Sequence, residues 1–306
     1  MKLFAPTYYK KFKCKADACR HSCCVGWDIY LDGGTLRKYQ TLDASVRERM
    51  LSYIDAESGK ITLRADGRCP YLMESGLCSV ISEMGDEYIC DICREHPRFY
   101  NFYRGRAEVG LGASCEEAAR LILSEDIPEF VQIGEIDPPC DDFSGFDSTE
   151  TRDEIYEILS DGDLNFSSKI KTVCYKLSIP EAAVSALLQR DFSQELEMLC
   201  EEHREIFKPK SKRSEGEFDK YLERALAYFI YRHLGDAENR DNQRARIALC
   251  ILLTYILENS LKCKDKVTFS DVCDLFRIIS EEIEYSEENT EYLIFELEYD
   301  ILSTDV

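Results

Sequence analysis

The chain has 306 residues, of which 44% are apolar and 32% charged, and its formal net charge is −21. A chain of this length can bury a core in one large or two modest domains, and its composition is neither disordered nor collagen-like. No apolar run approaches the roughly 18 residues of a membrane span, so no membrane contact is expected. The net acidity argues against nucleic-acid binding, because phosphates are neutralised by clustered Lys and Arg.

The amino terminus, residues 1–10, lacks the apolar core of about 7 to 15 residues that secretory signals contain. We therefore expect the protein in the cytoplasm, where thiols stay reduced. In that compartment the 15 cysteines favour metal binding or redox chemistry over disulfides.

Charge and cysteine content divide the chain near residue 123. Up to Leu123 there are 18 basic and 17 acidic residues and nine of the cysteines, whereas the remainder holds 20 basic and 42 acidic residues. Residues 124–148 combine proline, glycine and many acids, which is typical of a linker. We predict a mainly α protein with three parts: a loop-rich, cysteine-cluster metal-binding (iron–sulfur) domain over 1–125, a linker or crossover over 126–148, and an acidic all-α domain over 149–306.

Few regular elements are expected in the first half. The pattern predicts a helix over 35–53 and a short strand over 61–64. Ser114 and Glu117 form the start signal of a further helix through Leu123. The rest is expected to be mostly loop, and a segment with so thin a core commonly depends on a metal for stability.

Paired residues predict where helices begin in the second half. In a capping box, a Ser or Thr side chain and an acidic side chain three residues later satisfy free backbone amides. Three such pairs occur: Thr151 with Glu154, Ser178 with Glu181, and Thr268 with Asp271.

Apolar residues keep helical spacing through most of the second half. This spacing holds over 222–230 and over 247–257, and the second stretch is apolar enough to predict a buried central helix. Further helices are predicted over 268–279 and over 289–302. Together they indicate a helical, bundle-like domain.

The first half carries a dense cysteine framework. Thiolates suit iron–sulfur clusters and zinc, and short spacings let one loop supply several ligands. A structural zinc site usually shows two short Cys-x2-4-Cys pairs; here Cys90-x2-Cys93 has the shortest spacing, whereas the leading motif is longer-spaced and ends in an adjacent pair, so we favour an iron–sulfur centre with zinc as the alternative. The framework is Cys14-x4-Cys19-x3-Cys23-Cys24, Cys69-x8-Cys78, Cys90-x2-Cys93 and Cys115.

At these residues the sequence resembles the flagellin lysine-N-methylases, a family within a wider group of cysteine-rich zinc- or iron-chelating proteins. Order and spacing agree over residues 12–120, whereas the second half resembles the family only in helical character, and the chain is shorter than typical members. The segments that carry the resemblance are Phe12-Lys13-Cys14, Cys19, Cys23-Cys24-Val25-Gly26-Trp27-Asp28-Ile29, Cys69-Pro70-Tyr71-Leu72, Gly76-Leu77-Cys78, Cys93-Arg94 with Pro97-Arg98, and Ser114-Cys115-Glu116-Glu117-Ala118-Ala119-Arg120.

The resemblance implies methyl transfer from S-adenosylmethionine to lysine side chains of flagellin by a protein with a cysteine-bound iron–sulfur centre of the 4Fe-4S type. Carried over residue by residue, the family's cysteines fall on Cys14, Cys19, Cys23, Cys24, Cys69, Cys78, Cys93 and Cys115. These exceed the ligands of one four-ligand cluster, so either two centres exist or the surplus thiols pack near one. Cys90 is an addition to the family pattern and a weaker candidate.

No familiar cofactor motif accompanies the cysteines. A dinucleotide-type glycine loop is absent, because Asp32-Gly33-Gly34 and Gly110-Leu111-Gly112 have neither its spacing nor its strand-then-helix context. The Cys-x3-Cys-x2-Cys triplet of radical S-adenosylmethionine enzymes is absent too. We therefore hypothesise that the cluster contacts the cofactor directly.

Four residues near the cysteines are candidate cofactor contacts. Trp27 and Asp28 would supply a wall and a hydrogen-bond acceptor, and the alternative is packing and capping of the metal loop. Arg94 and Arg98 would anchor a carboxylate through their planar forks, and the alternative is ordinary ion pairing.

Other residues have plainer interpretations. His21 and His96 are possible metal ligands, but thiolates outnumber them. His203 and His233 lie in acidic helical sequence and are expected to be exposed. The later cysteines are expected to be small buried apolar residues on helices; they are Cys140, Cys174, Cys200, Cys250, Cys263 and Cys273.

Two functions remain open at this point. One is a protein-lysine methylase whose acidic half attracts lysine-bearing segments of flagellin, although the same acidity also suits a plain solvated surface. The other is a non-catalytic iron–sulfur or zinc module for electron transfer or metal handling, with an acidic docking domain. No catalytic residue and no oligomeric state are assigned.

Overall fold

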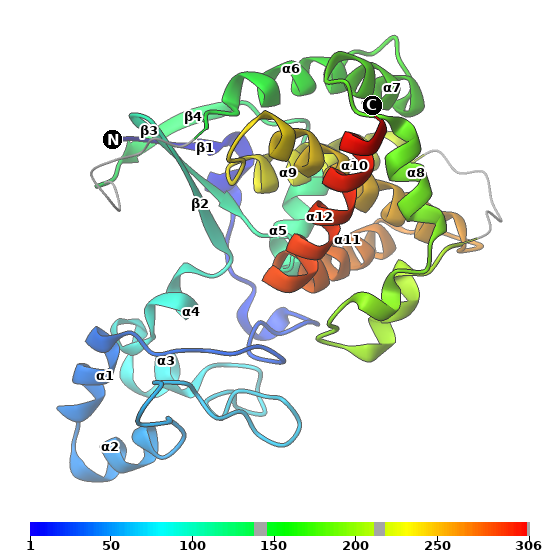
Figure 1. Ribbon diagram of the computed structural model, residues 1–306. Helices are drawn as coiled ribbons and strands as arrows, with labels where there is room; N and C mark the ends of the chain where they lie inside the picture. Colours follow the sequence, from blue (N-terminus) through cyan, green and yellow to red (C-terminus); the bar gives the residue numbers. More distant parts are fainter. Residues whose placement is uncertain (138–145, 211–217, 305–306) are drawn as a thin grey trace. The chain divides into compact units, whose positions relative to one another are not determined.

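The computed structural model describes residues 1–137, 146–210 and 218–304 (Figure 1). The chain forms two compact units. We call Lys13–Arg98 the cysteine unit, and Met1–Phe12 together with Phe99–Val306 the sheet–helix unit. Composition predicted a boundary after residue 125, whereas these units divide the chain at residues 12 and 98. The reason is that the first residues form a strand that pairs with segments beyond residue 98.

A small sheet begins the sheet–helix unit. Its strands are β1 (Lys2–Pro6), β2 (Arg98–Tyr103), β3 (Arg106–Leu111) and β4 (Phe130–Glu135), in the order β2-β3-β1-β4. β1 pairs in parallel with β3 and antiparallel with β4, so it is an interior strand. Side chains of β2 alternate between buried and half-buried, as expected for a strand with one face on the core.

The predicted linker is wrong for residues 130–135. They form β4, in which Phe130 pairs with Pro6 and Gln132 with Phe4. Phe130 also packs edge-on against Tyr231, with ring centroids 4.8 Å apart. Residues 138–145, with Cys140, lie outside the described residues.

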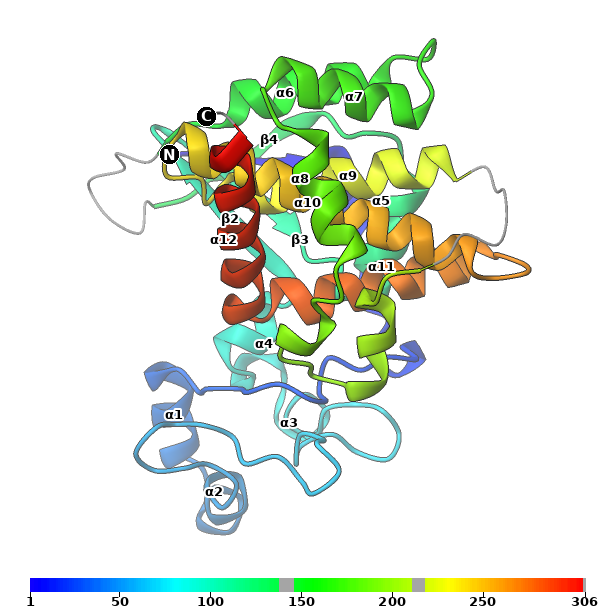
Figure 2. The same cartoon turned by 45° about the vertical axis from the view of Figure 1, so that its right-hand side comes forward.

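Helices form the rest of the sheet–helix unit, which confirms the mainly α fold. Figure 1 shows α9 to α12 gathered together, and in both views α6 and α7 follow one another along one side of that group (Figure 2). Within the described residues, no helix is both long and apolar enough to cross a membrane. The helices are α5 (Glu116–Ser124), α6 (Thr149–Ser160), α7 (Phe166–Lys176), α8 (Glu181–Gln189), α9 (Asp219–Leu234), α10 (Arg240–Lys262), α11 (Phe269–Glu284) and α12 (Glu287–Thr304), with short 3-10 turns η1 (Thr7–Lys11), η4 (Ser193–Glu195) and η5 (Glu201–Phe207).

The predicted central helix is confirmed as α10. Ile247, Leu252 and Leu257 are fully buried, and the helix contacts α8, α9, α11 and α12. A helix that is apolar nearly all round requires neighbours on every side, and α10 has them.

Helix starts were predicted with mixed success. α11 begins with the predicted capping box, in which Thr268 and Asp271 bond each other's backbone amides. The other two boxes are wrong: α6 follows Ser148 and α8 follows Pro180, and neither start has a side-chain cap. Thr151 lies inside α6, so its side chain has no free amide to satisfy.

The two histidines expected to be exposed are largely buried. His233 is 4% exposed, and its Nε2 lies 3.5 Å from Oε1 of Glu284. Nδ1 of His203 lies 2.6 Å from Oε1 of Glu282. Both carboxylates are fully buried on α11, so each histidine has an interior partner that the sequence pattern did not reveal.

The cysteine unit has short elements and a small core. The predicted helix over 35–53 is two helices, α1 (Gly33–Gln40) and α2 (Ala44–Leu51), and the predicted strand over 61–64 is wrong, because Ile61 makes an isolated bridge with Ile54. The remaining elements are η2 (Ala16–Ala18), α3 (Ser79–Met84), η3 (Asp86–Tyr88) and α4 (Asp91–Glu95).

A buried ion pair ties α6 to the sheet and yields a testable prediction. Arg152 Nη1 lies 2.5 Å from Oε2 of Glu108 on β3, and their side chains are 3% and 0% exposed. Replacing Glu108 with Gln removes the buried carboxylate partner of Arg152 and leaves it the more exposed Asp153, so we expect a loss of up to about 3–5 kcal/mol in the free energy of unfolding by urea. Glu117→Gln, at an exposed pair with Arg120 on one helix, is the matched control and should cost less than about 0.5 kcal/mol. Equal losses would contradict the assignment.

The capping box of α11 predicts a pH dependence. Hydrogen bonds from Lys264 and Thr268 lower the pKa of Asp271 below its usual value. A lowered pKa in the folded state means that the stabilisation is present above about pH 4 and is lost as the pH falls below it. Asp271→Asn should therefore cost about 0.3–1 kcal/mol at neutral pH, and the difference from the unmodified protein should shrink in acid. Urea unfolding followed by circular dichroism at both pH values measures this difference.

Candidate metal centre

Eight cysteines line one cavity of about 250 Å³ in the cysteine unit. The sequence brings them from separate loops that are far apart in the chain. The cavity is otherwise lined mainly by apolar side chains, among them Trp27, Ile29, Leu77 and Val80. The cysteines are Cys14, Cys19, Cys23, Cys24, Cys69, Cys78, Cys90 and Cys93.

Five of these cysteines form an inner group, which we define as Cys24, Cys69, Cys78, Cys90 and Cys93. They interact electrostatically with one another. Cys69 and Cys90 are each 5% exposed and belong to the core of the unit. The other three, Cys14, Cys19 and Cys23, lie on the first loop, where Cys14 and Cys23 are exposed.

Backbone pairing brings the first loop to the second. The amide of Cys69 donates to the carbonyl of Cys24 at 2.8 Å, and the amide of Gly26 donates to the carbonyl of Gly67 at 3.0 Å. Gly26 has φ +88°, a left-handed conformation that side chains disfavour. The Cys-Cys-Val-Gly sequence therefore turns sharply after its thiols, and this pairing sets Cys24 next to Cys69.

A tight turn delivers Cys78. Met73 donates to the carbonyl of Leu77 at 2.9 Å and accepts from the amide of Gly76 at 3.0 Å. Gly76 has φ +84°, and a Cβ there would lie 3.3 Å from the backbone of Asp17. The glycine thus allows this turn to approach the loop between Cys14 and Cys19, and Cys78 then precedes the first residue of α3.

The last pair is presented by α4. Cys90 precedes the helix and Cys93 lies one turn along it, so both thiols fall on one side. Asp32, which caps α1, also accepts from the amide of Asp91 at 3.0 Å. The start of α4 is therefore held by the start of α1.

The thiols within each adjacent pair share protons by hydrogen bonding. The bond with Cys23 lowers the pKa of Cys24 to about 7, and the bond with Cys93 lowers the pKa of Cys90. The same bond to Cys90, together with burial, raises the pKa of Cys93. Burial raises the pKa of Cys69 to about 11. Several thiolates close together in an apolar cavity would be costly without a cation, and a bound metal supplies that charge.

The donor set fits a thiolate-bound metal centre. The described cysteines are not joined in disulfides. The inner group exceeds four thiols, the number that a structural zinc ion or an iron–sulfur cluster requires. The cavity therefore holds enough thiols for either metal, although among the described residues no three cysteine sulfurs lie within 4.8 Å of one another, as the ligands of a single zinc ion would.

For two cysteines, the position in the structure differs from what their ranking as ligand candidates suggested. Cys90, ranked as the weaker candidate, is as buried as Cys69 and lines the cavity. Cys115, ranked with the family cysteines, precedes α5 in the sheet–helix unit. Its assignment as a ligand stays a prediction. The later cysteines follow their plain interpretation where α7, α10 and α11 bury Cys174, Cys250 and Cys273.

Of the four candidate cofactor contacts, one lines the cavity and the other three bond to neighbouring parts of the cysteine unit. Trp27 lines the cavity and its indole donates to the carbonyl of Cys23 at 2.6 Å. Asp28 pairs with Lys60, with Nζ and Oδ2 2.6 Å apart. Arg94 donates to the carbonyl of Ile89 at 2.9 Å, and Arg98 to that of Arg94 at 3.2 Å. Within the described contacts, Asp28 and both arginines thus support the local fold.

His96 shields the cavity wall rather than lining it. Its ring centroid lies 5.9 Å from that of Trp27, with the two ring planes tilted by 34°, and burial lowers the pKa of His96 to about 4. Tyr39 and Tyr71, which sequence analysis did not single out, line the cavity and are 2% and 5% exposed. Tyr71 could have been singled out from the sequence, because it directly follows Cys69-Pro70.

The two glycine runs have structural roles. Asp32 caps α1 before Gly33 and Gly34 and accepts from the amide of Thr35 at 2.7 Å. Gly110 lies in β3 where a side chain would collide with Phe99 and Tyr231. Both roles agree with the absence of a dinucleotide-binding loop.

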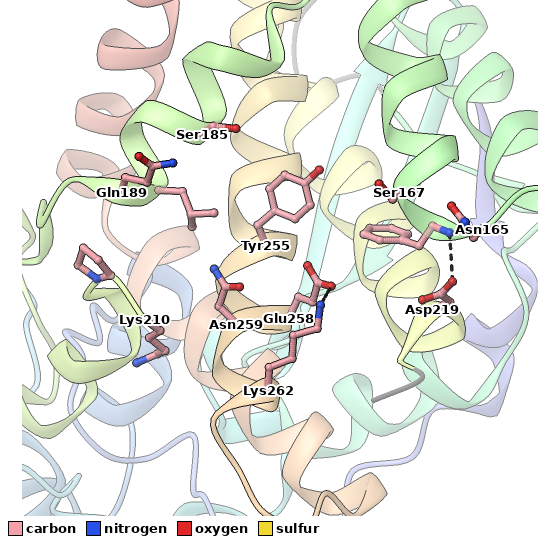
Figure 3. Close-up of a pocket in the computed structure, with 13 residues that line it drawn as sticks. Asn165, Ser167, Ser185, Gln189, Lys210, Asp219, Tyr255, Glu258, Asn259 and Lys262 are labelled. Atoms are coloured by element: carbon pink, nitrogen blue, oxygen red, sulfur yellow. Dashed lines mark hydrogen bonds and ion pairs between the residues drawn. The ribbon is translucent and has the colours of Figure 1, made fainter. Parts of the chain in front are cut away.

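A larger cavity of about 690 Å³ occurs in the sheet–helix unit between α7, α8 and α10 (Figure 3). Tyr255 projects into its middle, as Figure 3 shows. The fold already uses several of its polar groups: Asp219 accepts from the amide of Phe166 at 3.1 Å, and Glu258 pairs with Lys262. Its lining contains no cysteine, so it does not compete as a soft-metal site.

A second group of potential ligands, His203, Glu281 and Glu282, lies in the sheet–helix unit. Glu282 accepts from the amides of Leu199 at 2.7 Å and Cys200 at 3.2 Å in addition to His203. Glu281 accepts from the guanidinium of Arg277 at 2.7 Å. These bonds account for both carboxylates as part of the fold.

Comparison with curated proteins finds relatives named for lysine methylation and flagellar biosynthesis. The chain is 33% identical over 128 residues to a lysine-N-methylase of Salmonella typhimurium. The aligned region covers 39% of this chain and 32% of that protein. It is 33% identical over 138 residues to the flagellar biosynthetic protein FliU of Salmonella muenchen, which covers 42% of this chain and 80% of that protein. The match thus spans about a third of the lysine-N-methylase. No family model matches the chain, and no solved structure does.

The cavity predicts which thiols govern metal binding. Cys90→Ser with Cys93→Ser leaves three inner thiols, fewer than a four-ligand centre requires, so we expect metal content after anaerobic purification to fall and the cysteine unit to become more sensitive to proteolysis. Cys174→Ser, a buried thiol on α7 that lies outside the cavity, is the matched control and should keep its full metal content. Metal and sulfide analysis measures both variants. Equal metal content in the two would sink the assignment of the cavity.

Proposed function

The chain belongs to the flagellin lysine-N-methylase family, and from that premise we propose that it N-methylates lysine side chains of flagellin. The observation that carries the proposal is the convergence of eight cysteines on one cavity. Seven of these are the cysteines that the resemblance assigns to the family, and Cys90 is an addition to that pattern.

We propose that the resident metal group is an iron–sulfur cluster held by four thiols of the inner group. Thiolates are its usual ligands, and the cavity encloses it in apolar side chains such as Ile29 and Val80. When bound, such a cluster supplies an iron centre whose electronic properties depend on burial and on hydrogen bonds to sulfur. Zinc is the alternative occupant.

We propose S-adenosylmethionine as the methyl donor, because its sulfonium group carries the methyl that lysine accepts. A lysine amine attacks only when neutral, and its usual pKa of about 10.4 makes that form scarce in water. An apolar environment favours the neutral amine, because burial disfavours the ammonium ion. Trp27, Ile29 and Leu77 give the cysteine cavity such an environment and exclude water from it.

A radiolabel assay tests the proposal. The protein, purified without air, is mixed with flagellin and S-adenosylmethionine that carries a labelled methyl group. We expect label to appear on flagellin lysines, to require the metal-loaded protein, and to be lost in the variant with both Cys90→Ser and Cys93→Ser but kept in Cys174→Ser. Amino-acid analysis of the hydrolysed flagellin then identifies methyl-lysine.

Two outcomes would contradict the proposal. Absence of transfer by a fully loaded protein would favour the non-catalytic alternative, a module for electron transfer or metal handling. Undiminished transfer by protein stripped of metal would separate methylation from the cysteine cavity. A colourless preparation rich in zinc and free of sulfide would overturn the iron–sulfur assignment, provided that purification excluded air.

A further inference from the structure

Helix α12 has apolar side chains on two opposite faces. Leu293, Leu297 and Ile301 are buried, and the helix packs on α8, α10 and α11. On the other side Phe295 is 67% exposed and Tyr299 66% exposed. Leu302, the next position on that side, is 45% exposed.

The exposed residues form a continuous stripe. Residues three, four and seven apart share one face of a helix, so Phe295, Tyr299 and Leu302 lie side by side. Figure 2 shows α12, in red, at the surface of the sheet–helix unit. Elsewhere in that unit the most exposed large apolar side chain among the described residues is Tyr175 on α7, at 87%, a single residue rather than a stripe.

Acidic residues flank this stripe. Glu288, Glu291 and Glu298 fall on the same face by helical spacing, and the first two are exposed. The sequence of α12 contains no Lys or Arg. We call this surface the α12 face and define it by Glu288, Glu291, Phe295, Glu298, Tyr299 and Leu302.

The combination of aromatic anchors and carboxylates determines which partner fits. Large apolar side chains on a helix commonly pack against the apolar side of another helix, and aromatic residues contribute most of the binding energy at such contacts. The carboxylates select for cations around that apolar side. Two copies of the α12 face would bring like charges together, which disfavours self-association through it.

We propose that the α12 face docks a lysine-bearing amphipathic helix of a protein partner. If the proposed function holds, this partner is the methylation substrate, and the α12 face raises its affinity without taking part in the methyl transfer. The lysine stems lie along Phe295 and Tyr299, and their ammonium groups reach Glu288, Glu291 and Glu298. The acidic half of the chain thus acts in substrate recruitment.

A binding assay tests the docking independently of catalysis. The probe is a fluorescent peptide of about 18 residues, or five helical turns, with Leu at helical spacing and Lys elsewhere. The full chain should bind it, and Phe295→Ser with Tyr299→Ser should weaken binding by about tenfold or more. Tyr175→Ser is the matched control and should bind like the unmodified protein. The same peptide with Glu in place of Lys should not bind.

The charged residues need a separate variant. Glu288→Gln with Glu291→Gln should weaken binding at low salt and reduce its dependence on ionic strength. These side chains are exposed, so circular dichroism and thermal unfolding should remain unchanged. This double variant keeps the proposal testable even if the aromatic variants fold poorly.

Kinetics distinguish docking from the proposed function. In the methyl-transfer assay the aromatic variant should raise KM for flagellin and leave kcat and metal content unchanged. If the unmodified protein binds the peptide through the α12 face but methylates nothing, the proposed function fails and docking stands. If it methylates flagellin and the aromatic variant matches it in both KM and peptide affinity, docking is overturned. Self-association abolished by the aromatic substitutions would also overturn it.

Discussion

The cost of burying thiolates dominates the cysteine unit. Its core is small, and Cys69 and Cys90 are members of it rather than additions to it. Thiolates buried in this apolar core require a nearby cation. Protonated thiols require none, but they form only weak hydrogen bonds and so stabilise the core little. The short helices, the glycine turns and the backbone pairing between Cys24 and Cys69 all serve to gather thiols. The proposed metal would supply that charge and would favour a single structure for this segment.

The spacing of the cysteines indicated a candidate metal site, but it did not indicate which of the cysteines are most deeply buried there. The closely spaced cysteines around Cys23 and Cys93 predicted metal ligands, because a short spacing lets one loop supply several thiolates to one centre. Cys90, a weaker candidate in the sequence analysis, is as buried as Cys69, and α4 beside it is held to α1 by the bond from the amide of Asp91 to Asp32, residues 59 positions apart. No local pattern contains such a contact. The roles of Asp28 and Arg94 were equally hidden, because each depends on which partner the fold brings close.

The helices of the second half were predictable, whereas the sheet was not. The apolar residues of α10 indicate that the helix is buried on every side, and this pattern lies entirely within the helix's own sequence. β1 is short, and its partners β3 and β4 come after the whole cysteine unit. β4 lies among prolines and acids that suggested a linker, and its place depends on Phe130 reaching Tyr231. The break between α1 and α2 was missed because the apolar spacing continues across it.

The chain order of the two units has a consequence for how the protein is made and maintained. The cysteine unit is inserted between β1 and β2, so β1 cannot pair until the ribosome has released the segments that form β3 and β4. Once the sheet forms, the insertion is a loop anchored at both ends, and the entropy of closing a loop grows only slowly with its length. The sheet–helix unit can therefore tolerate an unravelled insertion, so the proposed metal would be inserted, lost and replaced while the larger core persists.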